Sequence, residues 1–439
     1  MFRPSIREES FGVIATLPDG SIDLFHKDAK ALFAEKRFTE MRKMTLGDSK
    51  TIVRRKREGM FRGSKFDIPS SVMNRSSILK SPLVIQLELT TLCNLRCKFC
   101  FSKAGVPREN ELPTSEIKRV IRQLKQENVS SFFLTGGEPT LHPNFVEIVN
   151  LISELGLDCF VLTNGTQLNA RLMSKIPNSV YIVMSFDGIN THVNSHGGLD
   201  FDAVREKFSL LKSARFPFSA QYVLHRKNIA DLERTYKWCG ENEIDFAAID
   251  LYPTGRAMAN PEIFLTEDDL DNMLRLAEAK FRYEQLQSTW IDRQIDVPNP
   301  FYFSFIARLE EIFERSFSGS FFASVSSDGI VFPDNFHAGE RMFPAGDIRK
   351  QDFAEIWHNG FEKVRELCKW DNFECCKSCE LSRYYCDFRL PVFSFNLHGN
   401  YNSCGTPEAQ KHLMLKRVQL RENTLTALSP DDAREKDNW

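Results

Sequence analysis

Six short stretches of this chain are almost continuously apolar, and more polar segments with helical periodicity separate them. The stretches cover residues 84–89, 131–135, 158–163, 180–186, 219–225 and 246–252. Apolar runs of this length without alternation are typical of parallel strands that are covered on both faces. The six stretches therefore predict a parallel β-sheet between residues 83 and 255.

The segments between these strands have the spacing of amphipathic helices. In residues 114–124 the apolar side chains recur three and four positions apart. They are Ile117, Val120, Ile121 and Leu124. Residues 144–156 repeat this spacing, and residues 201–214 and 229–242 supply the other crossovers. Alternating strands and helices predict an α/β fold. Because six units are too few to close an eight-stranded barrel, we expect a partial (β/α)6 barrel with its working face at the carboxyl ends of the strands.

The pattern changes on both sides of this barrel. Near the amino terminus, an alternating segment, the turn signal Asp19-Gly20 and a second alternating segment precede a helix start, which predicts a small α+β module. After the barrel the segments become shorter and rich in cysteine. The predicted regions are 1–80 (N-terminal module), 81–265 (barrel), 266–320 (helical connector), 321–416 (cysteine-rich domain) and 417–439 (polar tail).

Composition and charge exclude several classes of protein. The 57 basic and 59 acidic residues give a net charge of −2, so no overall field attracts nucleic acid or an anionic membrane. No apolar run is long enough to span a membrane, and the first residues lack the apolar core of a secretory signal. We therefore expect a cytoplasmic protein with neither nucleic acid nor membrane among its partners. In a reducing compartment, eleven cysteines indicate metal binding rather than disulfides.

Three cysteines directly follow the first predicted strand, as Cys93-x3-Cys97-x2-Cys100 in TTLCNLRCKFC. This places them on a loop at the working face of the barrel. Thiolates suit iron–sulfur clusters and zinc, but a structural zinc site needs four ligands. Three cysteines without a nearby fourth ligand fit a [4Fe–4S] cluster that keeps one iron open for an exogenous ligand.

The sequence LTTLCNLRCKFC resembles the cluster loop of the radical S-adenosylmethionine (SAM) superfamily, a CxxxCxφC pattern in which Phe99 is the aromatic residue. The resemblance covers roughly residues 83–255. It implies that Cys93, Cys97 and Cys100 hold a [4Fe–4S] cluster whose fourth iron binds SAM. It also implies that the reduced cluster cleaves SAM to a 5′-deoxyadenosyl radical, which takes a hydrogen atom from an unactivated carbon.

Further motifs at the strand ends resemble the SAM-binding positions of this family. Residues 135–139 read TGGEP, in which Gly136 and Gly137 would let the backbone approach SAM and Glu138 would accept from its amino group. Each motif also has an ordinary explanation as a turn or a helix cap. The cofactor-binding residues that the resemblance implies are Phe99, Gly136, Gly137, Glu138, Pro139, Thr163, Asn164, Ser185, Asp187, Val223 and Tyr252.

A second set of cysteines lies near the carboxyl terminus and resembles the SPASM extension of radical SAM enzymes. Its four spaced members are Cys376, Cys379, Cys386 and Cys404. Four thiolates suit a closed [4Fe–4S] cluster, and a zinc ribbon is the alternative. Relatives hold two auxiliary clusters, but Asp334 and Leu390 stand here where ligands of one of them are expected. We therefore predict one auxiliary [4Fe–4S] cluster. Cys368 and Cys375 are surplus, and Cys375 is an alternative to the adjacent Cys376.

The resemblance to SPASM enzymes implies a peptide substrate. We expect a peptide maturase that closes a carbon–carbon or thioether cross-link in a ribosomally made precursor peptide. Peptide epimerisation and formylglycine formation on a sulfatase are the enzymatic alternatives, and a non-catalytic iron–sulfur or zinc scaffold is the other. The N-terminal module loosely resembles a leader-recognition domain, so the expected partners are a precursor peptide with its leader and a flavodoxin- or ferredoxin-type reductant. No catalytic residue is assigned; Tyr252, His225, Asp334 and His337 are polar candidates.

Overall fold

A computed structural model describes the parts of the chain that build the barrel and most of the cysteine-rich region. The described residues are 5–9, 12–16, 22–25, 28–36, 79–191, 198–269, 310, 315–379, 386 and 388–412. The predicted polar tail and most of the predicted helical connector lie outside these residues. The domain limits therefore stay predictions.

Six adjacent parallel strands form the centre of the sheet, in the order of the sequence. They are β4 (Val84–Thr90), β5 (Ser131–Gly136), β6 (Asp158–Thr163), β7 (Tyr181–Ser185), β8 (Phe218–Leu224) and β9 (Asp245–Asp250). Each lies within two residues of a predicted strand. The partial α/β barrel is thus confirmed.

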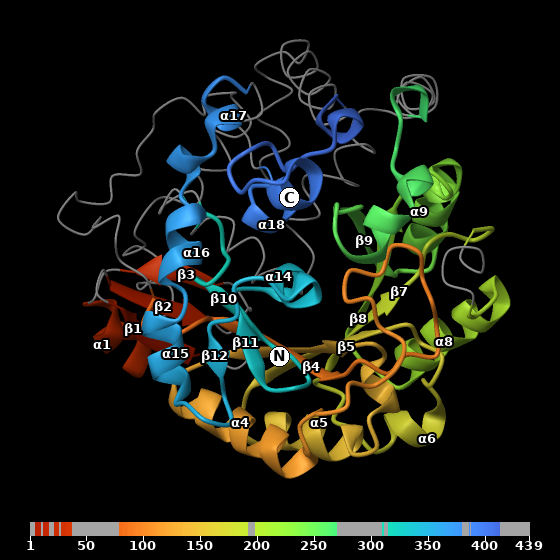
Figure 1. The fold of residues 1–439 in the computed structure, drawn as a ribbon. Coiled ribbons are helices and arrows are strands. Elements are labelled where there is room, and N and C mark those ends of the chain that lie inside the picture. The colour runs from red at the N-terminus through yellow and green to blue at the C-terminus, as the bar shows by residue number, and fades with distance from the viewer. Residues whose placement is uncertain are drawn as a thin grey trace, which may run out of the picture.

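Helices cover the outer side of this curved sheet (Figure 1). They are α4 (Thr114–Gln126), α5 (Phe145–Glu154), α6 (Ala170–Met173), α8 (Phe201–Ser213) and α9 (Leu232–Glu241). The four apolar residues predicted to face the sheet from α4 are all buried. Four 3-10 turns follow strands: η2 (Pro139–Leu141), η3 (Ile229–Asp231), η4 (Gly255–Ala259) and η5 (Pro261–Ile263).

The sheet continues beyond β4 with strands from the cysteine-rich region, which the sequence did not predict. Strand β10 (Phe322–Val325) pairs in parallel with β4, and β11 (Ile330–Phe332) and β12 (Gly346–Asp347) follow in antiparallel pairing. The sheet therefore crosses the predicted boundary at residue 320. As a result, the cysteine-rich region lies against the strand whose end carries Cys93.

Short helices follow in the described part of the cysteine-rich region. They are α14 (Asn335–Glu340), α15 (Phe353–Asn359), α16 (Glu362–Leu367), η6 (Trp370–Asn372), α17 (Glu374–Lys377) and α18 (Pro391–His398). The Trp357 indole is buried and donates to the carbonyl oxygen of Leu79, 2.7 Å away. This contact fixes α15 to the segment that precedes β4.

A small antiparallel sheet precedes the barrel. It contains β1 (Ser5–Glu9), β2 (Gly12–Thr16) and β3 (Ile22–Phe25), and α1 (Ala29–Ala34) follows it. The hairpin and the helix start were predicted, whereas β1 was missed because SIREE has no apolar alternation. Arg7 donates to the carbonyl oxygen of Pro82 (3.1 Å), and Glu9 accepts from the amide of Lys80 (3.0 Å). These contacts attach β1 to the barrel.

Candidate active site and auxiliary cysteine site

Cys93, Cys97 and Cys100 lie on the loop that leaves β4, and all three are partly exposed. The Cys93 thiol accepts a hydrogen bond from the amide of Leu95, 3.4 Å away. Burial raises the pKa of Cys93, and charge on Cys97, Glu138 and Cys100 raises this pKa further. The three predicted ligands therefore share one small region at the carboxyl end of the barrel strands, as the motif required.

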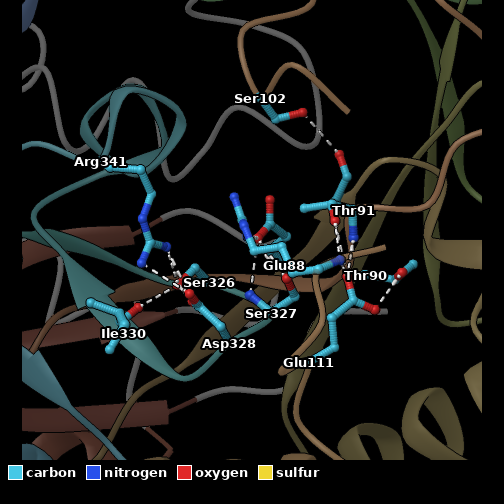
Figure 2. A network of polar contacts seen from close by, with 12 residues as sticks. Glu88, Thr90, Thr91, Ser102, Glu111, Ser326, Ser327, Asp328, Ile330 and Arg341 are labelled. Atoms are coloured by element: carbon cyan, nitrogen blue, oxygen red, sulfur yellow. Dashed lines mark hydrogen bonds and ion pairs between the residues drawn. The ribbon is translucent and has the colours of Figure 1, made fainter. Parts of the chain in front are cut away.

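Glu111 fixes the start of this cysteine loop (Figure 2). Its carboxylate accepts from the Thr91 amide (2.6 Å), the Thr90 hydroxyl (2.8 Å) and the Arg108 amide (3.2 Å). One side chain thus connects Thr90 and Thr91, at the start of the cysteine loop, with Arg108, which follows the loop. Glu111 was not predicted from the sequence, because a single acidic residue in a turn-rich segment carries no spacing signal.

Arg256 fixes the middle of the loop from the opposite side of the barrel. Its guanidinium donates to the carbonyl oxygens of Cys97 and Ala104, both 2.8 Å away, and its amide donates to that of Cys100 (3.0 Å). Gly255 has a φ of +65°, and a Cβ atom there would lie 2.4 Å from the Cys100 carbonyl oxygen. The segment after β9 is therefore docked directly on the cysteine loop.

The two glycines of the TGGEP motif are needed for contact with the same loop. The Gly137 amide donates to the carbonyl oxygen of Thr90, 2.7 Å away. A Cβ atom would lie 2.1 Å from the Thr90 carbonyl oxygen at Gly136, and 2.2 Å from that of Leu92 at Gly137. We expected these glycines to make room for SAM. The structure shows that they make room for protein backbone, and their approach to SAM, like that of the buried Pro139, stays a prediction.

Glu138 joins the ends of β5 and β6. It is fully buried and accepts from the Thr163 hydroxyl (2.7 Å), the Asn164 amide (2.7 Å) and the Thr140 amide (3.2 Å). Burial raises the pKa of Glu138, and these hydrogen bonds oppose the increase. The Asn164 side chain in turn lies 3.9 Å from the Cys93 sulfur. Glu138 therefore positions Asn164 beside the cysteine loop, whereas its contact with a SAM amino group stays a prediction.

The predicted SAM residues of the later strands lie at successive strand ends. Asp187 is fully buried, and its carboxylate accepts from the Val223 amide, 2.9 Å away. Ser185 ends β7 and is partly exposed. The Phe99 ring lies 5.4 Å from the ring of His225 and, like Val223, packs on a small apolar cluster. The structure thus brings the loop aromatic and the β7 and β8 ends to one side of the barrel mouth.

Tyr252 lies between the barrel and the cysteine-rich region. Its ring is stacked on Phe393, with 5.2 Å between centroids and 10° between planes, and it also contacts Phe336 (4.8 Å) and Phe388 (5.3 Å). We predicted Tyr252 as a SAM contact, which stays a prediction. The structure gives it a second role as a packing residue against the cysteine-rich region.

The C-terminal cysteines line one pocket of about 420 Å³. Its thiols are Cys375, Cys376, Cys379, Cys386 and Cys404. The sulfurs of Cys375 and Cys376 are 3.9 Å apart. Burial and the neighbouring thiols raise the pKa of Cys375. The four predicted ligands therefore line one pocket together with the surplus Cys375, but among the described residues no three Cys, His, Asp or Glu side chains converge closely enough to hold a single metal ion. This donor set fits a [4Fe–4S] cluster or zinc.

The two positions that lack expected ligands have other roles. Asp334 is fully buried and caps α14, accepting from the amides of Phe336 (2.7 Å) and His337 (2.9 Å) and contacting His337 Nδ1 (2.6 Å). Leu390 is buried in an apolar cluster. Cys368 is buried outside the five-thiol pocket, and burial raises its pKa. These roles support the prediction of a single auxiliary cluster.

Two family models match the chain. Residues 87–239 match the radical SAM superfamily, and residues 317–380 match SPASM, an iron–sulfur cluster-binding domain. The chain thus carries a radical SAM domain followed by a SPASM domain. This radical SAM protein is therefore an enzyme that uses a [4Fe–4S] cluster and SAM, with a SPASM domain that binds auxiliary iron–sulfur. The individual cluster ligands stay predictions.

This radical SAM enzyme is similar to proteins of different named activities. It is 28% identical over 341 residues to an AdoMet-dependent heme synthase of Methanosarcina barkeri (strain Fusaro / DSM 804), covering 70% of this chain and 94% of the relative. It is 28% identical over 315 residues to a PqqA peptide cyclase of Bradyrhizobium diazoefficiens, covering 68% and 79%. The crystal structure of Streptococcus suis SuiB bound to precursor peptide SuiA shares the fold, with a TM-score of 0.62, 15% identity, and 93% and 100% coverage.

One further observation concerns the membrane. Among the residues that the structure describes, no helix has the length and apolar character needed to cross a bilayer.

Proposed function

We propose that this enzyme is a peptide maturase that forms an intramolecular carbon–carbon or thioether cross-link in a ribosomally made precursor peptide. Similarity to a PqqA peptide cyclase, and to the fold of SuiB with its precursor peptide, supports a peptide substrate. Similarity to a heme synthase makes a tetrapyrrole the competing substrate class. The choice of a cross-linking reaction is supported by a segment that contacts both cysteine sites.

One short segment after β9 touches both cysteine sites. Arg256 donates to Cys97 in the cysteine loop, and Tyr252, four residues earlier, packs on Phe388. Phe388 lines the five-thiol pocket. An electron acceptor in that pocket would therefore be separated from the barrel mouth by little more than aromatic side chains. This arrangement suits a reaction in which the substrate is oxidised.

Cross-linking is such a reaction. Joining two positions of a peptide removes two hydrogen atoms, which amount to two electrons and two protons. Bound SAM and a reduced cluster at Cys93, Cys97 and Cys100 supply a radical that takes one hydrogen atom from carbon. The remaining electron needs an acceptor, for which the five-thiol pocket provides the site. Epimerisation is redox-neutral overall and needs no such acceptor.

The N-terminal sheet is the proposed binding site for the leader of the precursor. Strand β1 is attached to the barrel through Arg7, and among the described residues β3 pairs only with β2. An extended leader can add to a free strand edge through main-chain hydrogen bonds. We place the leader at the outer edge of β3, and expect a flavodoxin- or ferredoxin-type reductant to supply electrons at the partly exposed cysteine loop.

The test combines two products. Reduced, oxygen-free enzyme is incubated with SAM and with the peptide encoded by a short reading frame beside its gene. We expect 5′-deoxyadenosine and a peptide lighter by two hydrogen atoms. Unchanged mass with altered chirality would support an epimerase. An aldehyde in the peptide, which serine oxidation also forms with loss of two hydrogen atoms and which a hydrazide reagent detects, would support a sulfatase maturase. Absence of 5′-deoxyadenosine would leave the scaffold alternative, and conversion of an iron tetrapyrrole with no change in the peptide would overturn the proposal.

A further inference from the structure

Two polar residues other than cysteine are buried in the wall of the five-thiol pocket. Arg389 and Thr406 both line the pocket, and they are only 5% and 6% exposed. Lys411 also lines it and is partly exposed. None of the three belongs to a motif, and none was predicted from the sequence as part of a site. A buried guanidinium and a buried hydroxyl beside five thiols therefore need an explanation.

Arg389 brings a fixed positive charge to this wall. Its guanidinium lies over the indole of Trp370, with 4.2 Å between the guanidinium carbon and the ring centroid. The preceding residue, Phe388, lines the same pocket and contacts Tyr252 on the segment after β9, with 5.3 Å between the ring centroids. Arginine keeps its charge in folded proteins. Arg389 therefore places a cation beside the aromatic residues that separate the pocket from the barrel mouth.

Thr406 brings a hydrogen-bond donor to one of the thiols. Its hydroxyl lies 3.7 Å from the Cys386 sulfur. A thiolate bound to iron has no proton to donate, so the hydroxyl of Thr406 would be the donor in the iron-loaded protein. The segment that carries Thr406 is packed closely on the segment that carries Arg389, because a Cβ atom at Gly405 would lie 2.3 Å from the Phe388 carbonyl oxygen. The donor and the cation therefore reach the pocket from two adjoining segments.

A cation and a hydrogen-bond donor both favour the reduced form of an iron–sulfur cluster. A cluster held by thiolates is negatively charged, and reduction adds one further negative charge. The reduction potential depends on the charge around the cluster, on hydrogen bonds to its sulfurs and on solvent exposure. The effect of a charge is larger in a buried site than in water. Arg389 and Thr406 would therefore stabilise the added electron and raise the reduction potential.

We propose that Arg389 and Thr406 set the reduction potential of the auxiliary cluster high enough for it to accept an electron from the substrate. As the cross-link forms, the substrate radical loses one electron to the cluster and one proton to solvent. The cluster, reduced by one electron, passes this electron to the oxidised form of the flavodoxin- or ferredoxin-type protein. The identity of the electron donor rests on the proposed function, whereas the effect of the two residues on the potential does not.

The first test is a redox titration of Arg389→Met and Thr406→Val. Both are made in the full chain with Cys93, Cys97 and Cys100 replaced by alanine, so that the auxiliary cluster is read alone by EPR. We expect Arg389→Met to lower the ratio of reduced to oxidised cluster about tenfold at a given potential, which is a shift of about 59 mV for a one-electron couple. Thr406→Val should shift the potential in the same direction by less. Unchanged or raised potentials in both variants, or zinc in place of a reducible cluster, would overturn the inference.

Two further variants separate an effect on the cluster from an effect on the fold. Arg389→Lys keeps the positive charge and should retain most of the wild-type potential. Lys350→Met removes one charge from an exposed residue that pairs with Asp347 and lies outside the pocket, so it should leave the potential unchanged. An equal shift in Lys350→Met and Arg389→Met would contradict the inference. If Arg389→Met fails to bind iron, Thr406→Val decides the question, because it exchanges a hydroxyl for a methyl group of similar size.

Turnover of the peptide tests the role of the potential in the reaction. In the enzyme with its cysteine loop intact, Arg389→Met should yield several times less cross-linked peptide per 5′-deoxyadenosine than wild type, because the substrate radical loses its electron more slowly. An equal yield despite a lowered potential would contradict the role of the cluster as acceptor. If wild-type enzyme modifies no peptide, the proposed function fails, and the titration still decides whether Arg389 and Thr406 set the potential.

Discussion

The guanidinium of Arg256 donates to the carbonyl oxygen of Cys97, the middle residue of the three-cysteine motif, across 2.8 Å. The two residues are far apart in the sequence, and no motif in the chain connects them. Their contact makes the end of β9 part of the support of the cluster loop. It also places Tyr252, on the same segment, against the C-terminal cysteine site. The segment after β9 is therefore a bridge between the two sets of thiols.

Arg256→Lys tests the bridge, because lysine keeps the charge and loses the planar fork that reaches Cys97 and Ala104 together. We expect the oxygen-free variant to lose iron from the first cluster several times faster than wild type when a chelator is added. Iron release is followed by absorbance. Arg205→Lys, on the exposed side of α8, is the control and should release iron at the wild-type rate. Equal rates in all three proteins would contradict the role of Arg256.

Glu111→Gln tests the closure of the same loop. A neutral amide replaces a carboxylate that accepts from Thr90, Thr91 and Arg108, and one carboxamide nitrogen then faces donors. Loss of such bonds costs about 1–3 kcal/mol. We expect the free energy of unfolding, measured with urea, to fall by this amount. Glu109→Gln, which is exposed, is the control. A fall in the free energy of unfolding that is smaller than the change in Glu109→Gln would contradict the role of Glu111 in closing the loop.

The iron content tests the number of clusters. One cluster on the β4 loop and one in the C-terminal pocket predict about eight irons per chain, and a second auxiliary cluster would bring the total to about twelve. Replacing Cys93, Cys97 and Cys100 together by alanine should leave about four. A total near twelve in the wild-type protein would contradict the prediction of a single auxiliary cluster.

Two single variants decide the ligand choice in the C-terminal pocket. Its sulfurs include the adjacent Cys375 and Cys376. If Cys376 is the ligand, as its spacing to Cys379 predicts, Cys376→Ser lowers the iron content and Cys375→Ser does not. Alkylation of the native iron-loaded protein should then label Cys375 in preference to Cys376, as read by mass spectrometry. The reverse pattern would reassign the ligand.

Asp334→Asn tests the buried pair of Asp334 and His337. Asp334 stands at the position where a cluster ligand was expected. Burial alone raises the pKa of Asp334, but His337 and the hydrogen bonds from Ser318 and the helix amides outweigh it and lower the pKa below its usual value. A carboxyl group whose pKa is lowered by folding stabilises the fold at pH values above its pKa in the unfolded protein, which is near 4. This contribution is lost as the pH falls through the pKa of the group in the folded protein. We expect Asp334→Asn to be less stable by about 1–3 kcal/mol at pH 7.

The pH dependence of that difference gives the control. The gap in unfolding free energy between wild type and Asp334→Asn should narrow as the pH falls below about 4, because the wild-type carboxyl then becomes protonated. Asp352→Asn should have no such effect, since Asp352 precedes α15 without capping it. A gap that is constant with pH would contradict the charge of Asp334 in the folded state.

The sequence predicted the strands and the cysteine loop because both depend on local patterns. Apolar runs locate β4 to β9 within two residues, and the spacing of Cys93, Cys97 and Cys100 identifies the loop. It did not predict β10, which pairs with β4 from more than two hundred residues away, since such pairing has no local signature.

The roles of Glu111, Arg256 and Glu138 could not be predicted for a related reason. Each acts through backbone groups of a segment that is distant in the sequence, and backbone partners leave no trace in residue identity. The glycines of TGGEP illustrate this point: the motif predicted a close approach, but only the structure identifies the Thr90 and Leu92 carbonyl groups as the neighbours.

The measurement that tests the central claim most directly is mass spectrometry of the peptide after reaction with the reduced enzyme and SAM. The account predicts a peptide lighter by two hydrogen atoms, formed together with 5′-deoxyadenosine and lost in Cys97→Ala. A peptide of unchanged mass and chirality, with 5′-deoxyadenosine formed equally by Cys97→Ala, would contradict it.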